Sequence, residues 1–504
     1  MIAGMLKPYQ RVAAERIADC KRMLLADQPG LGKTFTSLGA LELSGVLTAG
    51  AVALVVAPLI TCDTAWSPTI RKYMPEVNFV DGFSGSRKQR DKRISVSVRD
   101  DMPNVIVTNH DSIGVTPKDV PHLPSLHALS PVAILVDESH AVLPMQYDRP
   151  WDATQFWRGL YALNGESSDV LRLAISGTPD RGKLYYRFGT WRFLLPKQLG
   201  PKIAQYQDWL ERTFFTWRVP MYLPNRTVHV LKIGHLRAPD NWKHLDRVLM
   251  IRRTKREVAQ DLPDKQYVDV DVPFSVPLLQ AYEDFIDEFV NTDDSSESNA
   301  LVFALRATQF AVCAWTSDDG VVLPIVGGES VKRDWLIDWM HSRNLHADAD
   351  DKPLGKVVVS SQFTRVLVWL KAELANAGIR SEILSGQVSQ AERLRVQREF
   401  QDVDSDLRVV LLSARMGVGI DLDAADDLVF VDIPVNPDVQ EQVEDRVHRV
   451  SRIHQVTIWR LRSRGTIDMT ISARNDEIYQ ETRHLLDGVR NVNFERKVLE
   501  RLGV

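Results

Sequence analysis

Short runs of consecutive apolar residues alternate with longer amphipathic segments along the first third of the chain. Five such runs lie at residues 23–26, 51–57, 104–108, 133–136 and 171–175. Runs of this kind suit strands that are buried on both faces of a parallel sheet. The segments between them are long enough to hold the helices that connect parallel strands. The pattern therefore predicts an α/β domain built on an open parallel sheet.

A second alternating block begins near residue 356. Its apolar runs lie at residues 356–360, 408–412, 428–431 and 456–461. These runs are as short and as continuous as those of the first block, so they predict a second parallel sheet with its own covering helices. The chain therefore carries two α/β lobes, and the two blocks can be structural duplicates without any repeated sequence.

The segment between the two blocks is typical of helical insertions and a linker. Trp335, Leu336, Trp339 and Met340 follow helical spacing, which is more typical of a helix core than of a ligand platform. The chain ends in a stretch typical of polar helices. The predicted domains are a first lobe at 1–245 with a helical insertion at about 185–245, a linker and helical insertion of the second lobe at 246–350, a second lobe at 351–470, and a C-terminal helical segment at 471–504.

Charge and composition exclude or disfavour several classes of protein. The 504 residues include 62 Lys and Arg against 66 Asp and Glu, a net charge of −4. This balance excludes a globally basic nucleic-acid coat but allows a local basic track. Basic clusters at residues 87–93 and 252–256 are, taken alone, more typical of a solvated surface. The three cysteines show no paired spacing, which argues against a disulfide framework or a zinc site.

The same composition bears on localisation. The first residues do not resemble a signal peptide, and no apolar run is long enough to cross a bilayer. Widely spaced cysteines fit a reducing compartment. We therefore expect no membrane contact and a cytoplasmic protein, in the nucleoid or in a host cytoplasm, or a nuclear one if the source is eukaryotic.

A phosphate loop directly follows the first apolar run. It reads Asp27-Gln28-Pro29-Gly30-Leu31-Gly32-Lys33-Thr34. A strand, a loop containing Gly30 and Gly32, and a helix together place backbone N–H groups around a phosphate. Lys33 would pair with the terminal phosphates of ATP, and Thr34 would hold Mg²⁺. Asp27 stands where the generic loop has glycine, which weakens the motif when it is taken alone.

An acidic pair follows the fourth apolar run. Asp137 would complete the magnesium site, and Glu138 would orient and deprotonate the attacking water. Alone, the segment from Asp137 to His140 would be typical of a polar turn after a strand. The phosphate loop upstream in the same block makes nucleotide hydrolysis the better interpretation. Gln10, before the first strand, is either an adenine-binding amide or a surface glutamine, and we weight the two equally.

Two arginines near the end of the second block could complete the nucleotide site. Arg446 and Arg449 are three residues apart, which would place them on one face of a helix. A guanidinium can neutralise the charge that develops on a transferred phosphoryl group. If the two blocks face each other across the nucleotide, these residues would be arginine fingers. The alternative is an ordinary salt-bridged surface helix.

The complete set of motifs resembles the SWI/SNF-type family of superfamily 2 helicase-like DNA translocases, and the resemblance covers nearly the whole chain in the family's order. Two stretches, Phe193–Pro196 and Met250–Lys265, are more specific to this family than to helicases in general. The segments that match the family's motifs are Leu6–Gln10 (adenine recognition), Asp27–Thr34 (I), Val55–Leu59 (Ia), Asp137–His140 (II), Ser176–Pro179 (III), Val359–Thr364 (IV), Leu412–Ile420 (V), and Asn436–Pro437 with Gln442–Arg449 (VI).

The sequence departs from the family pattern at a few positions. Gln28 and Pro29 replace the usual Glu and Met, and Asp421 stands where Asn is usual. Residues 180–183 also lack the family's usual continuation after motif III. Asp27, in contrast, is the residue that the family pattern has at that point. The chain is thus identified as a divergent member that retains the residues expected to turn over ATP.

The resemblance implies a fold, two ligands and several roles. It implies two RecA-like parallel-sheet lobes with a C-terminal helical brace, ATP and Mg²⁺ as ligands, and DNA as the partner. Gly417 and Gly419 of motif V would join the nucleotide site. The implied DNA contacts are Pro58, Thr108, Asn109 and His110 in the first lobe and Gln362, Phe363, Thr364, Ser413 and Arg415 in the second. The implied coupling residues, which connect ATP to DNA grip, are His140, Ser176 and Thr178.

The leading functional hypothesis is an ATP-dependent motor that steps along duplex or branched DNA without having to separate its strands. We expect a monomer that is nearly all motor, of a bacterial or phage type, acting in replication, recombination or repair by fork remodelling, strand annealing or removal of bound protein. The alternatives are a strand-separating helicase and an ATP-gated clamp on DNA junctions.

Overall fold

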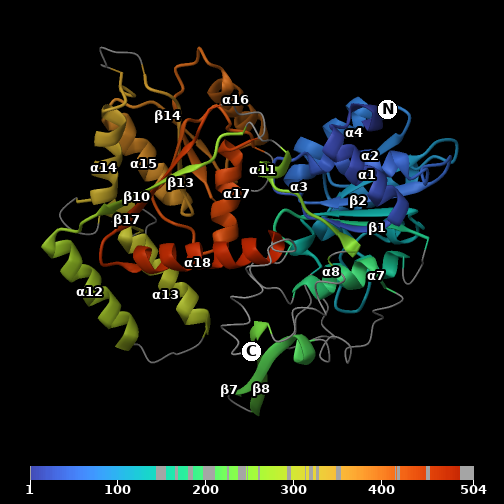
Figure 1. Ribbon diagram of the computed structural model, residues 1–504, viewed down its shortest axis with the longest axis horizontal. Coiled ribbons are helices and arrows are strands. Elements are labelled where there is room, and N and C mark those ends of the chain that lie inside the picture. Colours follow the sequence, from blue (N-terminus) through green and yellow to red (C-terminus); the bar gives the residue numbers. More distant parts are fainter. Residues whose placement is uncertain are drawn as a thin grey trace. The chain divides into compact units, whose positions relative to one another are not determined.

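The computed structural model describes two compact units, one at residues 1–258 with 486–504 and the other at residues 259–485. Each unit contains its own parallel sheet and its own apolar core (Figure 1). The described residues are 2–143, 155–164, 169–179, 186–196, 210–223, 226–236, 246, 248–258, 262–291, 297–312, 314–316, 322–324, 329–347, 353–414, 416, 420–449 and 454–487.

The sheet of the first unit has seven parallel strands in the order β3-β4-β2-β5-β6-β1-β9. All five predicted strands are present, each within a residue or two of its predicted limits. The strands are β1 (Arg22–Leu25), β2 (Val52–Ala57), β3 (Asn78–Asp81), β4 (Asn104–Asn109), β5 (Ala133–Asp137), β6 (Leu171–Ile175) and β9 (Met250–Ile251). The short strands β3 and β9 were not predicted: β3 begins and ends with the polar Asn78 and Asp81, and β9 has only two residues.

Helices cover both faces of this sheet. Because successive side chains of a strand point to opposite faces, Leu24 packs with the core on one face while Met23 and Leu25 pack on the other. Figure 1 shows α1, α2 and α4 on one side of the strands and α7 and α8 on the other. The helices are α1 (Pro8–Cys20), α2 (Lys33–Leu43), α3 (Leu59–Thr61), α4 (Ser67–Tyr73), α5 (Arg87–Ser97), α6 (Pro124–His127), α7 (Gln155–Asn164), α8 (Arg187–Leu194) and α11 (Lys255–Val258).

The second unit has a six-stranded parallel sheet in the order β10-β17-β16-β13-β15-β14. Its strands are β10 (Gln266–Val272), β13 (Val357–Ser361), β14 (Ser381–Leu384), β15 (Val409–Ser413), β16 (Asp427–Phe430) and β17 (Thr457–Ser463). Its helices are α12 (Val276–Asn291), α13 (Glu297–Ala311), α14 (Val331–His341), α15 (Thr364–Asn376), α16 (Gln390–Gln401), α17 (Pro437–Val447) and α18 (Ile467–Asp487). A small antiparallel pair, β11 (Ala314–Thr316) and β12 (Val322–Pro324), lies outside the main sheet.

Helix α14 has the helical core that was predicted from aromatic spacing. Leu336 and Met340 are buried, and the rings of Trp335 and Trp339 stack with centroids 5.7 Å apart. Trp459 of β17 packs against the edge of Trp339, at 5.3 Å between centroids. The aromatic side chains therefore attach α14 to the sheet, as the apolar pattern indicated.

The segment expected to be a linker and a helical insertion, residues 246–350, contributes a strand to each sheet. Strand β9 pairs with β1 in the first sheet, and β10 pairs with β17 in the second. Strand β9 is only two residues long, and β10 reads Gln-Tyr-Val-Asp-Val-Asp-Val, an alternating pattern typical of an edge strand. The prediction did not include them because β9 is too short and β10 is interrupted by aspartates.

The insertion at about 185–245 is not purely helical. After α8, the chain forms an antiparallel hairpin of β7 (Phe214–Leu223) and β8 (Arg226–Leu236). Both strands are rich in β-branched and aromatic residues, which favour extended backbone. No helix in the described part of the chain is long and apolar enough to cross a membrane.

Candidate functional site

The predicted motifs of the first unit gather at one edge of its sheet. The phosphate loop follows β1, motif Ia follows β2, motif II follows β5 and motif III follows β6. All of these strands are parallel, and the registers pair Val136 with Ala174 and Asp137 with Ile175. The carboxyl ends of parallel strands meet at the same edge, which is where open α/β sheets bind their ligands. The fold thus brings the four motifs together.

The phosphate loop has the backbone that an anion cradle needs. Gly30 and Gly32 have φ values of 86° and 75°, and α2 begins directly afterwards at Lys33. The positive φ of Gly32 favours glycine, and a Cβ atom there would also displace the amide nitrogen of Gln10. The N-terminal N–H groups of α2 and its positive end then suit a phosphate.

Some polar side chains of the loop and of the first turn of α2 bond to backbone carbonyls, and one is available to a ligand. Lys33 Nζ donates to the Asp27 carbonyl at 2.9 Å. The hydroxyls of Thr36 and Ser37 donate back to the carbonyls of Gly32 and Lys33. Among the described residues, the Thr34 side chain has no hydrogen-bond partner, so its hydroxyl is available to a metal ion or a phosphate.

Gln10 lies against the phosphate loop. Its amide nitrogen donates to the Leu31 carbonyl at 3.1 Å, and its amide oxygen accepts from the Lys7 N–H at 3.0 Å. The side chain is buried, so it is not the surface glutamine that the sequence left open. Through these contacts Gln10 positions the loop. A contact between Gln10 and adenine stays a prediction.

A segment after the hairpin binds the same loop. The Arg253 guanidinium pairs with both carboxylate oxygens of Asp27, and the Arg253 N–H donates to Asp27 Oδ1 at 3.0 Å. Arg252 donates to the carbonyls of Ala26 at 2.8 Å and Gly177 at 3.2 Å. The Lys255 N–H donates to the Gln28 side chain at 2.7 Å. Residues 252–255 therefore bind the phosphate loop.

The interpretation of this basic cluster from its charge was wrong in two respects. Arg252 and Arg253 are not on a solvated surface, because carbonyls and the buried Asp27 carboxylate engage them. The prediction also assigned residues 246–350 to the linker and insertion of the second lobe, whereas the residues up to Val258 belong to the first unit. The signal that could have identified the contact was Asp27 itself, because a buried acid needs a cationic partner.

Removing the Asp27 carboxylate should destabilise the first unit. Asp27→Ala is expected to cost about 3 kcal/mol, near the lower end for breaking a buried ion pair, because the Arg253 side chain keeps 16% exposure. The urea midpoint of the first unit, followed by circular dichroism, measures this change, and nucleotide binding should weaken with it.

The matched control is Asp101→Ala, which removes the acid of the exposed Arg99–Asp101 pair. It is expected to leave the urea midpoint unchanged because exposed ion pairs contribute little. An Asp27→Ala midpoint equal to that of Asp101→Ala would contradict the role of the buried pair.

Motif II carries both a strained backbone and a fixed carboxylate. Glu138 adopts φ 45° and ψ 48°, a left-handed conformation that is uncommon outside glycine and often found at functional sites. The Asp137 carboxylate accepts from the Glu138 N–H at 3.0 Å and from the Trp66 indole N–H at 2.9 Å. Trp66 was not predicted at this site, because a lone tryptophan in a sequence does not reveal its partner.

The residues at this edge suit Mg²⁺. This ion prefers oxygen ligands and commonly uses only one or two protein side chains together with phosphate oxygens. Asp137 and the available hydroxyl of Thr34 supply such a set. No group of three or more His, Cys, Asp or Glu side chains that could hold a metal occurs among the described residues. The donors present therefore match magnesium bound with a nucleotide better than a closed all-protein metal site.

The predicted coupling residues are joined by hydrogen bonds. His140 Nδ1 lies 2.7 Å from Ser176 Oγ and 3.3 Å from Glu138 Oε2. The Thr178 N–H donates to Ser176 Oγ at 3.2 Å. His110 Nε2 donates to the Asp137 carbonyl at 2.9 Å. Motifs II and III and the end of β4 thus form one network, with Glu138 in it.

The other expected DNA contacts of the first unit differ in access. Pro58 precedes α3 at the carboxyl end of β2. Thr108 is fully buried, and its hydroxyl donates to the Gly82 carbonyl at 2.9 Å, so its side chain does not suit a phosphate contact. Asn109 is also buried, and its amide oxygen accepts from Arg90 at 2.8 Å. Thr108 and Asn109 therefore hold the end of β4 in place.

Motifs IV and V meet at the carboxyl edge of the second sheet. Strands β13 and β15 pair in register at Ser361 and Ser413, and the Ala414 N–H donates to the Ser361 carbonyl at 2.9 Å. Gln362 and Phe363 follow β13, and Thr364 begins α15. The structure therefore places Gln362, Phe363, Thr364 and Ser413 at one edge. Arg415, Gly417 and Gly419 lie outside the described residues.

A buried carboxylate fixes the motif IV loop. Asp432, just after β16, accepts from the Gln362 N–H at 3.0 Å. Burial is the main cause that raises the pKa of Asp432, to about 6. The nearby Lys332 ammonium acts in the opposite direction, and Lys332 itself pairs with Asp468 of α18 at 2.6 Å. The loop that carries Gln362 and Phe363 is thus anchored from within the second unit.

The two candidate arginine fingers are not on one helical face. Helix α17 ends at Val447, so Arg446 lies in its last turn and Arg449 lies beyond it. Arg446 donates to the Met416 carbonyl at 3.0 Å, and Arg449 pairs with Asp421 at 2.7 Å. His448 turns the chain out of the helix, which explains why the three-residue spacing misled. Asp421, the departure from the family pattern, is thus the acid that holds Arg449.

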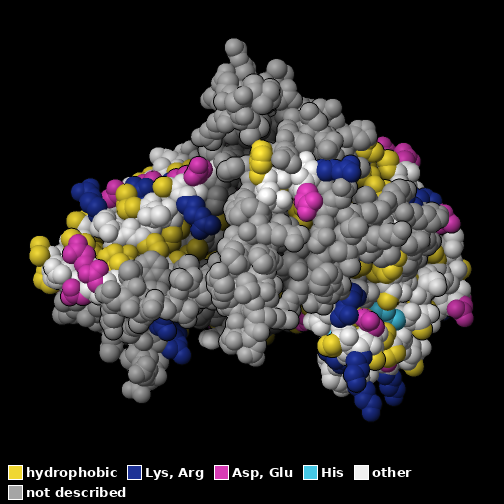
Figure 2. All heavy atoms as spheres, turned by 90° about the horizontal axis from the view of Figure 1, so that it is seen from below, with side chains coloured by type: hydrophobic (Ala, Val, Ile, Leu, Met, Phe, Trp, Pro, Cys, Tyr) yellow, Lys and Arg dark blue, Asp and Glu magenta, His cyan; other side chains and the backbone are white. Residues whose placement is uncertain are grey.

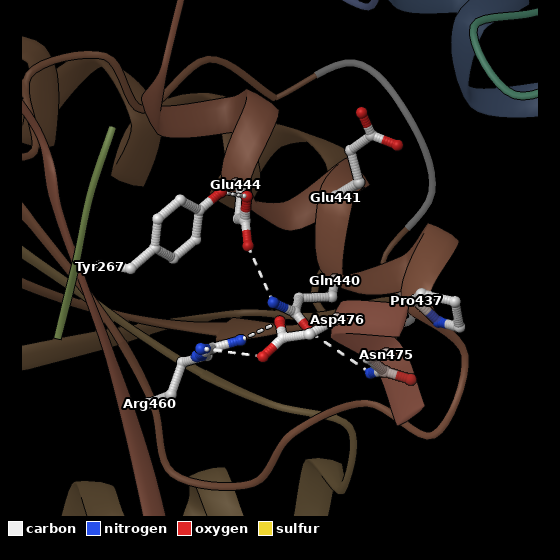
Figure 3. Close-up of a pocket in the computed structure, with 8 residues that line it drawn as sticks. All are labelled: Tyr267, Pro437, Gln440, Glu441, Glu444, Arg460, Asn475 and Asp476. Atoms are coloured by element: carbon white, nitrogen blue, oxygen red, sulfur yellow. Dashed lines mark hydrogen bonds and ion pairs between the residues drawn. The ribbon is translucent and has the colours of Figure 1, made fainter. Parts of the chain in front are cut away.

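Helix α17 is anchored by its acidic face beside a hollow of about 210 Å³. Figure 3 shows Glu444 close to Gln440 and Tyr267, and Arg460 close to Asp476. Glu444 accepts from the Tyr267 hydroxyl at 2.7 Å and from Lys265 Nζ at 2.9 Å, and Arg460 pairs with Asp476 at 2.7 Å. Six of the residues that line this hollow bind one another, and they fix the helix that carries Arg446.

Charged side chains are mixed on the described surface. Figure 2 shows Lys and Arg side chains standing between Asp and Glu side chains, without one continuous basic band on the described part of that face. The mixture agrees with the net charge of −4. The basic cluster at residues 87–93 is partly engaged in a similar way, since Arg93 pairs with Asp81 at 3.1 Å.

Comparisons with known proteins agree with the order of the motifs. A family model described as SNF2-related domain matches residues 9–310, and one described as helicase conserved C-terminal domain matches residues 335–451. A SWI/SNF-related regulator of chromatin, subfamily A containing DEAD/H box 1 homolog, from Caenorhabditis elegans is 22% identical over 93% of this chain and 50% of its own length. Nuclear protein STH1/NPS1 of Saccharomyces cerevisiae is 25% identical, over 94% of this chain and 34% of its own length.

Two further matches extend the comparison. ATP-dependent helicase brm of Drosophila melanogaster is 25% identical over 99% of this chain and 29% of its own length. The solved Sulfolobus solfataricus SWI2/SNF2 ATPase core in complex with dsDNA aligns over 96% of this chain and 92% of that one, with 21% identity and a TM-score of 0.39. The chain spans half the length or less of these three curated relatives.

Proposed function

Because the chain belongs to the SNF2-related family of helicase-like, DNA-dependent ATPases, we propose that it is a motor that couples ATP hydrolysis to stepping along duplex DNA. One observation above all supports this proposal. Glu138 Oε2 lies 3.3 Å from His140, which is hydrogen-bonded to Ser176, and the Asp137 carbonyl accepts from His110, directly after β4. A change at the γ-phosphate can therefore reach residues that are expected to govern DNA grip.

The roles proposed in the first unit follow from its contacts. The backbone around Gly30 and Gly32 would bind the phosphates of ATP, and Lys33 would exchange its contact with the Asp27 carbonyl for the terminal phosphates. Thr34 and Asp137 would hold Mg²⁺, which when bound neutralises phosphate charge. Glu138, beside His140, would orient the attacking water and take its proton.

Arg446 and Arg449 are proposed to stabilise the charge of the transferred phosphoryl group. Arg446→Ala and Arg449→Ala should each lower ATP turnover by about 10³–10⁵-fold, with a much smaller effect on ATP binding. Steady-state turnover and a fluorescent-nucleotide titration measure the two effects. Arg474→Ala, at an exposed arginine of α18, is the matched control. Near-normal turnover in both single variants would contradict the assignment.

Grip on DNA is proposed to use one sheet edge in each unit. Pro58 and His110 lie at the edge of the first sheet, and Thr364 lies at the edge of the second, beside the buried side chains of Gln362 and Ser413. Hydroxyls, amides and N-terminal helix N–H groups suit phosphate contacts that do not read base sequence. Such contacts let a motor step along any duplex. We also propose that the motor acts as a monomer, and in replication, recombination or repair.

A strand-displacement assay distinguishes the translocase from the two alternatives, a strand-separating helicase and a clamp. A translocase should displace a triplex-forming oligonucleotide from duplex DNA in an ATP-dependent reaction, and it should leave a labelled complementary strand annealed. A strand-separating helicase should displace that strand as well. A clamp should displace neither. Failure to displace the triplex strand under conditions in which DNA stimulates ATP turnover would overturn the translocase proposal.

A further inference from the structure

Trp66 contacts the nucleotide site from within the core of the first unit. Its side chain is 0% exposed, and its indole N–H donates to Asp137 Oδ2 at 2.9 Å. The two residues are 71 positions apart in the chain. No role in ATP hydrolysis or DNA grip follows for Trp66 from the motifs themselves, although it lies on the segment that begins at Pro58.

The backbone before Trp66 is unusual. Pro58 precedes α3, and the chain then forms a π-helix over Cys62–Trp66 before α4 begins at Ser67. A π-helical turn is rare, rotates the side chains that follow it, and is frequent at functional sites. Cys62, in the same turn, is fully buried, and its sulfur lies 3.4 Å from the Thr108 carbonyl oxygen. The turn thus sets the direction of the indole from a well-packed position.

The Asp137 carboxylate needs a donor of this kind. The residue is only 9% exposed, and a buried carboxylate is costly unless hydrogen bonds compensate for its lost water. The Glu138 N–H serves Oδ1, and the indole serves Oδ2. An indole is a neutral donor that cannot accept, so it orients the carboxylate while leaving its full negative charge for a cation. An arginine at the same place would neutralise that charge.

We propose that Trp66 is a positioning residue that orients the Asp137 carboxylate toward Mg²⁺ and links it to the segment that begins at Pro58. The proposal rests on the proposed function of Asp137 as a magnesium ligand. It adds a second connection between the metal site and the expected DNA-gripping surface, distinct from the network through His140. A shift of the Pro58–Trp66 segment on DNA binding would then act directly on the metal ligand.

The test removes the donor and keeps an aromatic ring. In Trp66→Phe the free Mg²⁺ concentration that gives half-maximal binding of a fluorescent ATP analogue should rise by about 10-fold or more, as is usual when a partner of a metal ligand is lost. Turnover at saturating Mg²⁺ should recover to within a few fold of the unchanged protein. Trp191→Phe, at another buried tryptophan of the same unit, is the matched control and should not change the Mg²⁺ requirement.

A second substitution guards against a folding defect. Trp66→β-(3-benzothienyl)alanine keeps both rings and lacks only the N–H donor, so it should reproduce the shift in Mg²⁺ requirement with a smaller fall in melting temperature than Trp66→Phe. An unchanged Mg²⁺ requirement in this variant would overturn the proposal.

Asp137→Ala separates this failure from that of the proposed function. If Asp137→Ala changes the Mg²⁺ requirement and the Trp66 variants do not, only the role of Trp66 is wrong. If Asp137→Ala leaves the requirement unchanged, Asp137 is not the magnesium ligand and both proposals fall. If all three variants raise it, both stand.

Discussion

Glu138→Gln is expected to lower ATP turnover by about 10²–10⁴-fold, the range for loss of a general base, while ATP still binds. Glutamine keeps the size and the hydrogen-bonding reach of the side chain but cannot accept a proton from water. The left-handed backbone at Glu138 and its 3.3 Å contact with His140 fix the direction of this side chain. Single-turnover hydrolysis and nucleotide binding, measured on the same sample, separate the two effects.

The same variant distinguishes a motor from a clamp. A motor needs hydrolysis, so Glu138→Gln should abolish triplex displacement. A clamp needs only ATP binding, so the variant would keep its function in a DNA-protection assay. The matched control is Glu76→Gln, which replaces an exposed glutamate of the same unit and should change neither activity. Turnover by Glu138→Gln at a normal rate would refute the assignment of the base.

Lys33→Ala is expected to abolish ATP turnover, by at least about 10³-fold, because the substitution removes the cation that neutralises the terminal phosphates. Unlike Glu138→Gln, it should also weaken binding of ATP more than binding of ADP, since the missing contact is to the terminal phosphates. Lys33 is partly exposed and its ammonium contacts a carbonyl, that of Asp27, so its loss should not destabilise the fold.

Lys72→Ala, at an exposed lysine of α4, controls for loss of a positive charge in the same unit. It should leave turnover unchanged. An Lys33→Ala protein that keeps turnover within a few fold of the unchanged chain would show that the loop at residues 27–34 does not bind the phosphates.

The sequence predicted those features that depend on residues close together in the chain. Short, mainly apolar runs predicted every central strand of both sheets, because a strand that is covered on both faces is mostly apolar. Motif order predicted the SNF2-related family, which the family models confirm. Lys33, Asp137 and Ser176 meet at one sheet edge because each follows or ends a parallel strand, and that too can be predicted from a sequence.

The remaining features depend on contacts between residues far apart in the chain. Arg253 and Asp27 are 226 positions apart, and Trp66 and Asp137 are 71 apart, so neither pairing has a local signature. Edge strands such as β10 alternate polar and apolar residues, and their assignment depends on the neighbour they pair with. The end of α17 before Arg449 was missed for a similar reason, because helix ends are set by tertiary contacts as much as by propensity.

The central claim is that this chain hydrolyses ATP in response to duplex DNA. The most direct measurement is ATP turnover in the presence of duplex DNA, forked DNA, single-stranded DNA or RNA, each nucleic acid at the same concentration of its nucleotide units. The Glu138→Gln variant measures the background turnover. The account predicts strong stimulation by duplex or forked DNA and little by RNA. Stimulation by RNA alone, or turnover that no DNA changes, would contradict it.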